Sequence, residues 1–169
     1  MFSVQAQNTS DVQLILKEVN HYRLMHLLKP LTLNPALSQI ALKHSQNMAQ
    51  HVYAFGHIGF DQRFAKIRQI LPNTAQASEN VAYGYKSIDA VVSGWTHSPG
   101  HRANILGSFD LTGIAIAYDQ NHRPYYTQIF ARQGRPIAPN TIKVVRHRNV
   151  GPSPQVLFHH VGQAFSKLF

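Results

Sequence analysis

Two observations predict an α+β fold for this sequence. Helical patterns fill most of the chain up to residue 106, and a pair of strand patterns follows between 112 and 131. Helices that precede an antiparallel hairpin are typical of α+β proteins and not of doubly wound parallel sheets. A chain of 169 residues suits one hydrophobic core. The sequence therefore predicts one globular domain.

Capping residues locate the first two helices. The first is predicted over 11–28, with Ser10 as its N-cap and Pro30 just after its end. The second is predicted over 35–53, with Asn34 as its N-cap and a proline at its first position. Both carry apolar residues at helical spacing, so each is expected to pack one face on the core.

The remaining elements are shorter. Turn and cap residues predict a helix at 61–70, a polar loop at 72–78, an extended segment at 80–83, a helix that Ser87 caps and that carries Trp95, and a last helix from Ser98-Pro99 to residue 106. Alternating apolar residues predict strands at 112–118 and 125–131, joined by a polar turn at 119–124. Trp95 is expected in the core because its ring buries a large apolar area.

The two ends of the chain differ from the part between them. Residues 1–10 are predicted to be an N-terminal extension without the basic start and long apolar stretch of an intact signal peptide. Residues 134–169 contain prolines and basic residues but no acidic ones. They are predicted to be a C-terminal tail whose end has helical spacing and can dock on the domain, a membrane surface or a partner.

Composition excludes several kinds of site. The chain has no cysteine, which excludes disulfides, zinc–thiolate sites and a cysteine nucleophile. Sixteen Lys and Arg against seven Asp and Glu give a net charge of +9, which favours anionic partners such as phospholipid head groups or acidic polysaccharides. The basic residues form no dense tract, which argues against nucleic acid. No apolar run reaches the roughly 18–20 residues of a membrane span.

Three polar residues form the candidate site. His57 lies between two glycines, and His101 lies near a helix start. Of the chain's two glutamates, Glu18 falls on a solvent-facing side of the first helix, which leaves Glu79 as the carboxylate for a site. Two imidazoles and a carboxylate can hold a divalent metal or act as an acid–base group. They can equally be structural, with the histidines bonded across the fold and Glu79 bracing loop amides.

Five sequence blocks occur in a recognisable order: NHYRLMHLLKPLTLNPALSQIALKHSQNMA, GHIGF, SENVAYG, GWTHSPGHRANIL and YYTQIFA. Together they resemble the CAP superfamily of cysteine-rich secretory proteins, insect venom antigens and plant pathogenesis-related proteins, in particular its cysteine-free bacterial branch. The resemblance covers residues 11–133. It implies a three-layer α/β/α sandwich with a central antiparallel sheet and a solvent-facing cleft.

The resemblance also assigns residues to that cleft. His57 and His101 match the two cleft histidines, Glu79 matches the acidic residue of a Glu-Asn block, and Asn80 goes with it. Many eukaryotic members carry another glutamate three residues after the helix tryptophan, where this chain has Ser98, and a serine holds a cation less strongly. The predicted cleft comprises His57, Glu79, Asn80, His97, Ser98 and His101, with His57 and His101 as the ligands of any metal.

Two functions are open on these observations. The favoured prediction is a non-enzymatic binding module, secreted or periplasmic, that takes a lipid, glycan, peptide or protein ligand and requires no cofactor. The alternative is a Zn²⁺-dependent hydrolase or peptidase in which His57 and His101 hold the metal and Glu79 activates water. The serine at position 98 and the lack of a His-Glu-x-x-His helix argue against it. Ser98 also lacks the Gly-x-Ser-x-Gly context of a nucleophile and is predicted to be an N-cap.

Overall fold

The computed structural model describes residues 9–134, which form five helices and a four-stranded sheet. In chain order these are α1 (Thr9–Met25), β1 (Thr32–Leu33), α2 (Pro35–Ala49), α3 (Phe60–Ile70), β2 (Thr74–Tyr83), α4 (Ile88–His97), α5 (Pro99–Ile105), β3 (Leu111–Tyr118) and β4 (Pro124–Gln133). Residues 135–169 of the predicted tail and residues 1–8 of the predicted extension lie outside the described residues, and residues 9 and 10, predicted as part of the extension, belong to α1.

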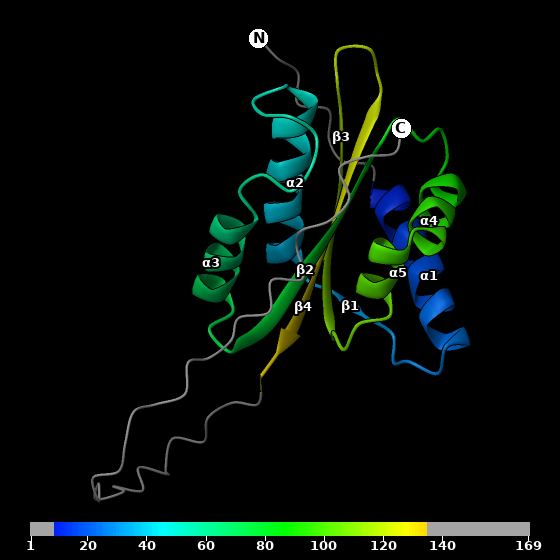
Figure 1. Cartoon of the computed structure of the whole chain (residues 1–169), viewed down its shortest axis with the longest axis vertical. Helices are drawn as coiled ribbons and strands as arrows, with labels where there is room; N and C mark the ends of the chain where they lie inside the picture. Colours follow the sequence, from blue (N-terminus) through cyan, green and yellow to red (C-terminus); the bar gives the residue numbers. More distant parts are fainter. Residues whose placement is uncertain (1–8, 135–169) are drawn as a thin grey trace, which may run out of the picture. The chain divides into compact units, whose positions relative to one another are not determined.

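The sheet has the strand order β1-β3-β4-β2 and separates two helical layers. Figure 1 shows α2 and α3 on one face and α1, α4 and α5 on the other. The predicted α+β class and three-layer sandwich are therefore confirmed. The prediction of an antiparallel sheet is wrong at one edge, because β1 pairs in parallel with β3 through Thr32 and Leu111. A strand of two residues is too short to produce an alternating pattern.

Local capping explains where the helices begin and end. The Asn34 side chain accepts hydrogen bonds from Ala36 N and Leu37 N at 3.0 and 3.1 Å, which confirms the predicted start of α2. The first helix ends at Met25 and not at residue 28. The chain turns left-handed at Leu27, with φ of 59°, before Pro30 can act as the stop.

Of the other predicted helix boundaries, some are confirmed and some are wrong. Ser87 Oγ accepts a hydrogen bond from Ala90 N at 3.2 Å, as an N-cap should. Ser98 occupies the N-cap position of α5, but its side chain makes no capping hydrogen bond. The second helix stops at Ala49, four residues before the predicted end, and the chain is left-handed again at His51.

The largest error of the sequence analysis concerns residues 74–78. They were expected in a polar loop, but they are the first half of β2, a ten-residue strand. This strand lies at the edge of the sheet, where residues 75–78 are exposed or half-buried and polar side chains are tolerated. Glu79 consequently lies within a strand and not in a loop.

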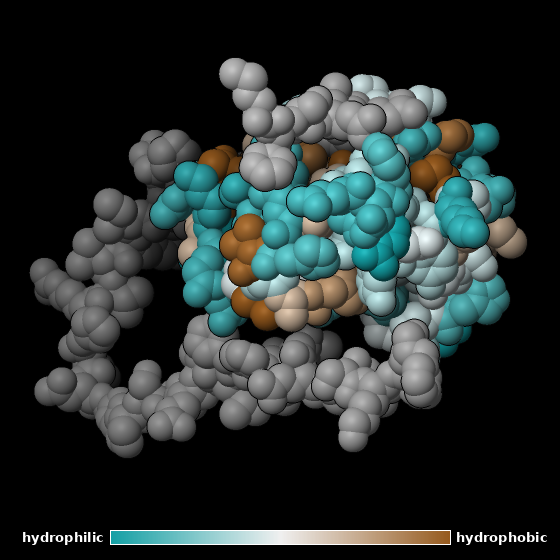
Figure 2. Space-filling view, turned by 90° about the horizontal axis from the view of Figure 1, so that it is seen from above, coloured by the Kyte–Doolittle hydropathy of each residue, from teal (hydrophilic) through white to brown (hydrophobic). Residues whose placement is uncertain are grey.

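Hydrophobic residues fill both faces of the sheet. The larger cluster packs α1, α4 and α5 on the sheet and includes Trp95, which is 1% exposed, as predicted. A second cluster lies under α2 and α3 and contains Leu37 and Ile67. None of the helices within residues 9–134 has the length and apolarity needed to cross a membrane. Figure 2 shows that apolar side chains on one outer face form small patches among hydrophilic ones.

Small residues on β3 allow α2 to lie close to the sheet. Gly113, Ala115 and Ala117 alternate along the strand with larger residues that face the other layer. A Cβ atom at Gly113 would overlap the backbone of Leu37 and Ser38 in α2. The close approach of helix and strand therefore depends on the glycine.

We expect Gly113→Ala to lower the free energy of unfolding by about 3 kcal/mol, because neither backbone can move away without opening the core. The matched control is Gly100→Ala in α5, where an added Cβ meets no atom within 4 Å. That change should be neutral or stabilise the protein by about 0.5 kcal/mol. Chemical unfolding of both variants measures the difference, and equal effects would contradict the close packing of α2 on β3.

Candidate functional site

Glu79 is held in β2 by a bidentate ion pair with Arg63 from α3. Arg63 Nε lies 2.7 Å from Glu79 Oε2, and Arg63 Nη2 lies 2.7 Å from Oε1. The Glu79 side chain is 1% exposed and that of Arg63 is 11% exposed. Paired charges that donate and accept two parallel hydrogen bonds form the strongest class of ionic contact in proteins. Both carboxylate oxygens are thus engaged inside the protein.

Two histidines also approach the Oε1 atom of Glu79. His57 Nδ1 lies 3.0 Å from it and His44 Nε2 lies 3.4 Å from it. The His57 side chain is 51% exposed, whereas that of His44 is fully buried. Because a carboxylate only accepts hydrogen bonds, His57 donates its Nδ1 proton, which leaves Nε2 of the neutral ring as an acceptor.

His44 has a defined tautomer because of its two other partners. Its Nε2 lies 3.0 Å from the carbonyl oxygen of Gly56 and must donate to it, while Nδ1 accepts from the Tyr53 hydroxyl at 2.6 Å. Burial lowers the pKa of His44 to about 4, against a smaller opposing effect of Glu79. His44 is therefore neutral at physiological pH and fastens the loop at 50–59 to α2.

Arg63 fastens the same loop from the other side. Its Nη1 donates to the carbonyl oxygen of Ile58 at 2.8 Å, and its Nη2 donates to that of His57 at 3.4 Å. One guanidinium thus binds the Glu79 carboxylate and the backbone on which His57 is mounted. The orientation of the His57 ring follows from these contacts together with its own bond to Glu79.

The Glu79 carboxyl group remains ionised because of these partners. Burial alone would raise its pKa, but hydrogen bonds from His57 and Arg63 and the positive charge of Arg63 bring the pKa below its ordinary value of 4.5. A general acid needs the opposite shift, toward neutrality. The environment of Glu79 therefore favours a permanent anion that organises its neighbours.

Asn80 connects the same strand to the opposite helical layer. It is fully buried, and its Nδ2 donates to the backbone carbonyl of His101 at 3.2 Å. Asn104 Nδ2 donates to Asn80 Oδ1 at 2.8 Å and to the carbonyl oxygen of Glu79 at 3.2 Å. Successive side chains of a strand point to opposite faces, so Glu79 and Asn80 fix α3 and α5 at the same level of β2.

His101 is half-buried on α5, and its Nδ1 atom has no hydrogen-bond partner within the described residues. Burial lowers its pKa, and His57 lowers it further when the His57 ring is protonated. The two imidazoles therefore lie within electrostatic range of each other, from opposite layers of the sandwich. We call His57, Glu79, Asn80 and His101 the histidine site. That these residues line a ligand cleft stays a prediction.

The other two residues predicted for the cleft have mainly local contacts. His97 is exposed, and its Nδ1 donates to the carbonyl oxygen of Ser93 at 2.8 Å within α4. Ser98 connects α4 to α5 through its backbone: its N–H donates to Gly94 and its carbonyl accepts from Arg102. Within residues 9–134, neither His97 nor Ser98 has a hydrogen bond or ion pair with the Glu79 side chain.

The geometry does not support a zinc-dependent hydrolase. Within residues 9–134 no three His, Asp or Glu side chains are arranged to hold a metal ion. The Glu79 side chain is 1% exposed and both of its oxygens bond to Arg63, which leaves it poorly placed to ligate a metal or activate a water. His57 and His101 alone supply two protein ligands, where catalytic zinc sites have three.

Sequence reasoning missed the residues that hold Glu79. Neither His44, on the second helix, nor Arg63 was singled out. A histidine on a buried helix face signals a polar partner in the core, since buried polar groups are bonded. A basic residue four positions after Gly59, at the start of α3, carries no comparable signal. Which carboxylate it meets depends on the tertiary fold.

Comparison with known proteins identifies the family that this fold and site define. The sequence profile of the cysteine-rich secretory protein (CAP) family matches residues 16–130. The chain therefore belongs to this family. Two proteins of Bacillus subtilis are similar: the uncharacterized membrane protein YlbC, 34% identical over 131 residues, and the uncharacterized protein YkwD, 34% identical over 118 residues. These alignments cover 75% and 69% of this chain but only 36% and 44% of the relatives.

Solved structures show the same fold. An extracellular protein with an SCP domain from Bacillus anthracis superposes with a TM-score of 0.65 at 29% identity, over 76% of this chain and 42% of that one. An outer surface protein from Borrelia burgdorferi gives a TM-score of 0.65 at 19% identity, over 74% of this chain and 94% of that one. At 19% identity the second likeness concerns the fold alone.

We expect Arg63→Leu to lower the free energy of unfolding by about 3–5 kcal/mol, because it leaves the buried Glu79 carboxylate without its cation. Adding Glu79→Gln should recover part of this loss, since the amide carries no charge to desolvate. The control is Arg68→Leu on the exposed face of α3, which should change stability by at most about 0.5 kcal/mol. Denaturant unfolding measures all three, and equal losses for both arginines would contradict the structural role of the ion pair.

Proposed function

We propose that this chain is a non-enzymatic binding module of the CAP family, in which His57 and His101 present their imidazoles to a ligand across β2. The observation that carries the proposal is the engagement of both Glu79 oxygens by Arg63 and the nearby histidines. A carboxylate held in this way positions an imidazole but exchanges no proton with a substrate. The predicted cleft between the two histidines is part of this proposal.

The free ring atoms favour ligands with hydroxyl or amide groups. When the His57 ring is neutral and its Nδ1–H donates a hydrogen bond to Glu79, its Nε2 is an acceptor. His101 is half-buried, and burial lowers its pKa, which favours the neutral ring. A neutral imidazole has one donor and one acceptor nitrogen, and hydroxyl and amide groups complement both. Among the predicted ligand classes, glycans, peptides and protein backbones carry such groups most densely.

The proposal places the protein outside the cytoplasm, secreted or exported. A structural neighbour from Bacillus anthracis is described as an extracellular protein. The net charge of +9 would raise the local concentration of the module at an anionic envelope surface. The chain spans less than half the length of its two Bacillus subtilis relatives. The ligand of a whole protein of this kind is therefore also a proposal.

The test compares native protein with a His57→Gln/His101→Gln double variant on a panel of oligosaccharides, peptides and phospholipid vesicles. We expect at least one ligand to be bound by the native chain and lost in the double variant, while the thermal midpoint changes little. His97→Gln is the matched control, because His97 bonds within α4, and this variant should bind like the native chain. A panel bound equally by all three proteins would contradict the proposal.

The same proteins test the enzymatic alternative. Turnover of ester and peptide substrates with added Zn²⁺ should be absent or identical in the native chain and the double variant. Zn²⁺-dependent cleavage that disappears in the double variant would overturn the binding-module proposal.

A further inference from the structure

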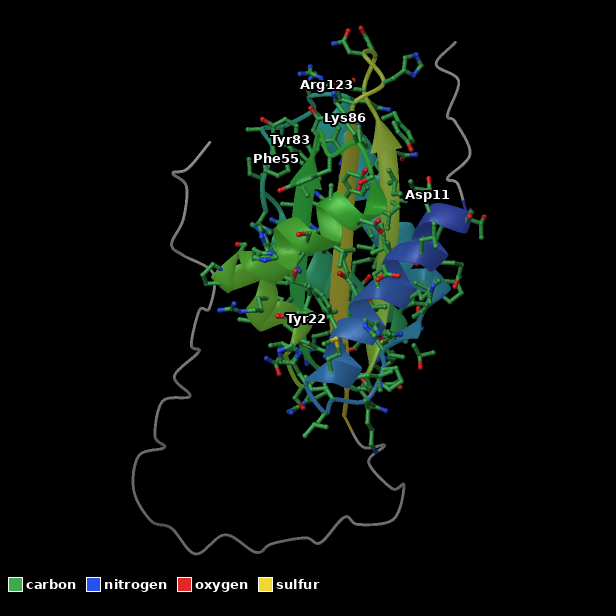
Figure 3. All side chains as sticks on the ribbon, turned by 90° about the vertical axis from the view of Figure 1, so that its right-hand side faces the viewer. Asp11, Tyr22, Phe55, Tyr83, Lys86 and Arg123 are labelled. Carbon is green, nitrogen blue, oxygen red and sulfur yellow. The ribbon has the colours of Figure 1, made fainter. Side chains whose placement is uncertain are left out.

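A second candidate site lies away from the histidine site, on the α1 and α4 side of the sheet. A cavity of about 460 Å³ opens between the start of α1, the segment between β2 and α4, and the hairpin of β3 and β4. We call it the tyrosine pocket; its lining includes Asp11, Tyr85, Lys86, Tyr118, His122 and Tyr126. Its volume falls in the range of small-ligand sites, about 300–1,000 Å³. Figure 3 shows Asp11 at one end of α1 and Lys86 toward the same end of the molecule.

The three tyrosines give the pocket rigid aromatic walls. Tyr126 is buried, and its hydroxyl donates to the carbonyl oxygen of Tyr85 at 2.9 Å, which ties the segment after β2 to β4. Tyr85 and Tyr118 are 37% and 40% exposed. A tyrosine ring offers an apolar face for stacking and a polar hydroxyl at its edge. The pocket can therefore stack on a flat ligand and hydrogen-bond to its rim.

The hydroxyls of Tyr118 and Tyr126 stay protonated at physiological pH. Burial raises the pKa of Tyr126 to about 12, and the neighbouring Tyr118 and Asp11 act in the same direction. Burial and then Asp11 also raise the pKa of Tyr118. Asp11 is thus within electrostatic range of two pocket tyrosines. Asp11 adds a carboxylate acceptor to the Tyr118 hydroxyl, whereas the Tyr126 hydroxyl already donates to Tyr85.

The charges that line the pocket cancel. Asp11 is an anion, Lys86 is a cation, and His122 is a further polar group at the rim. A ligand with a single net charge would meet attraction from one side and repulsion from the other. An apolar chain would desolvate both charges without replacing their hydrogen bonds, which is costly. A neutral ligand dense in hydroxyl groups satisfies donors and acceptors together.

We propose that the tyrosine pocket is a binding subsite for a neutral glycan, whose pyranose rings stack on Tyr85 or Tyr118 and whose hydroxyls bond to Asp11 and Lys86. This goes beyond the proposed function, because the pocket shares no residue with the histidine site. Ligand binding at one of the two sites can be absent while the other site binds its ligand.

The experiment titrates the full chain with chitohexaose, cellohexaose and mannohexaose by calorimetry, with a heparin fragment and anionic phospholipid vesicles as competing probes. We expect binding of at least one neutral oligosaccharide, weakened about tenfold by Tyr118→Ala through loss of ring stacking. Lys86→Ala, at an exposed position, should weaken it as well and is a second variant if Tyr118→Ala melts early.

Tyr83→Ala is the matched aromatic control. Its ring is 48% exposed and packs on Phe55 at 4.8 Å and on Tyr125 at 5.6 Å, outside the pocket. It should bind the oligosaccharide like the native chain. Absence of neutral glycan binding, binding of heparin or vesicles alone, or an equal loss of binding in Tyr83→Ala would overturn the proposal.

Discussion

The ion pair between Arg63 and Glu79 is the contact on which the histidine site depends. The Arg63 guanidinium neutralises the buried Glu79 carboxylate and donates to the backbone carbonyls of the loop that carries His57. Without the cation, Glu79 would bear the cost of a buried, unpaired charge. Without the carboxylate, neither Arg63 nor His57 would have its principal partner in this part of the chain. One pair thus sets the charge, the loop position and the ring orientation together.

The edge strand β2 extends this arrangement across the sandwich. Glu79 faces the layer of α2 and α3, while Asn80 faces α5 and binds the backbone of His101. The edge itself is partly covered, because Asn104 donates to the carbonyl of Glu79 and the Trp95 indole donates to that of Val81. Covered carbonyls make an edge less prone to pair with another strand. The helices that position His101 therefore also protect the strand that positions His57.

Some local features of the fold could be predicted from the sequence, but contacts between distant elements could not. Asn34 and Ser87 cap their helices as expected, because capping involves only neighbouring backbone groups. The polar first half of β2 was mistaken for a loop, since an edge strand needs no alternating apolar pattern. Glu79 was identified by its scarcity, but its partner Arg63 is sixteen positions away. That pairing follows only from the packing of α3 against β2.

The central claim is that Glu79 is a fixed anion and exchanges no proton during function. Its most direct test is a ¹³C NMR titration of the glutamate side-chain carboxyl groups, with Trp95 fluorescence recorded on the same samples to confirm that the chain stays folded. The chain has two glutamates, so the Glu79→Gln variant assigns the resonance. We predict a pKa for Glu79 below its ordinary value of 4.5. A pKa above 4.5 would contradict the account, because the carboxyl group would then behave as an acid–base group and not as the partner of Arg63.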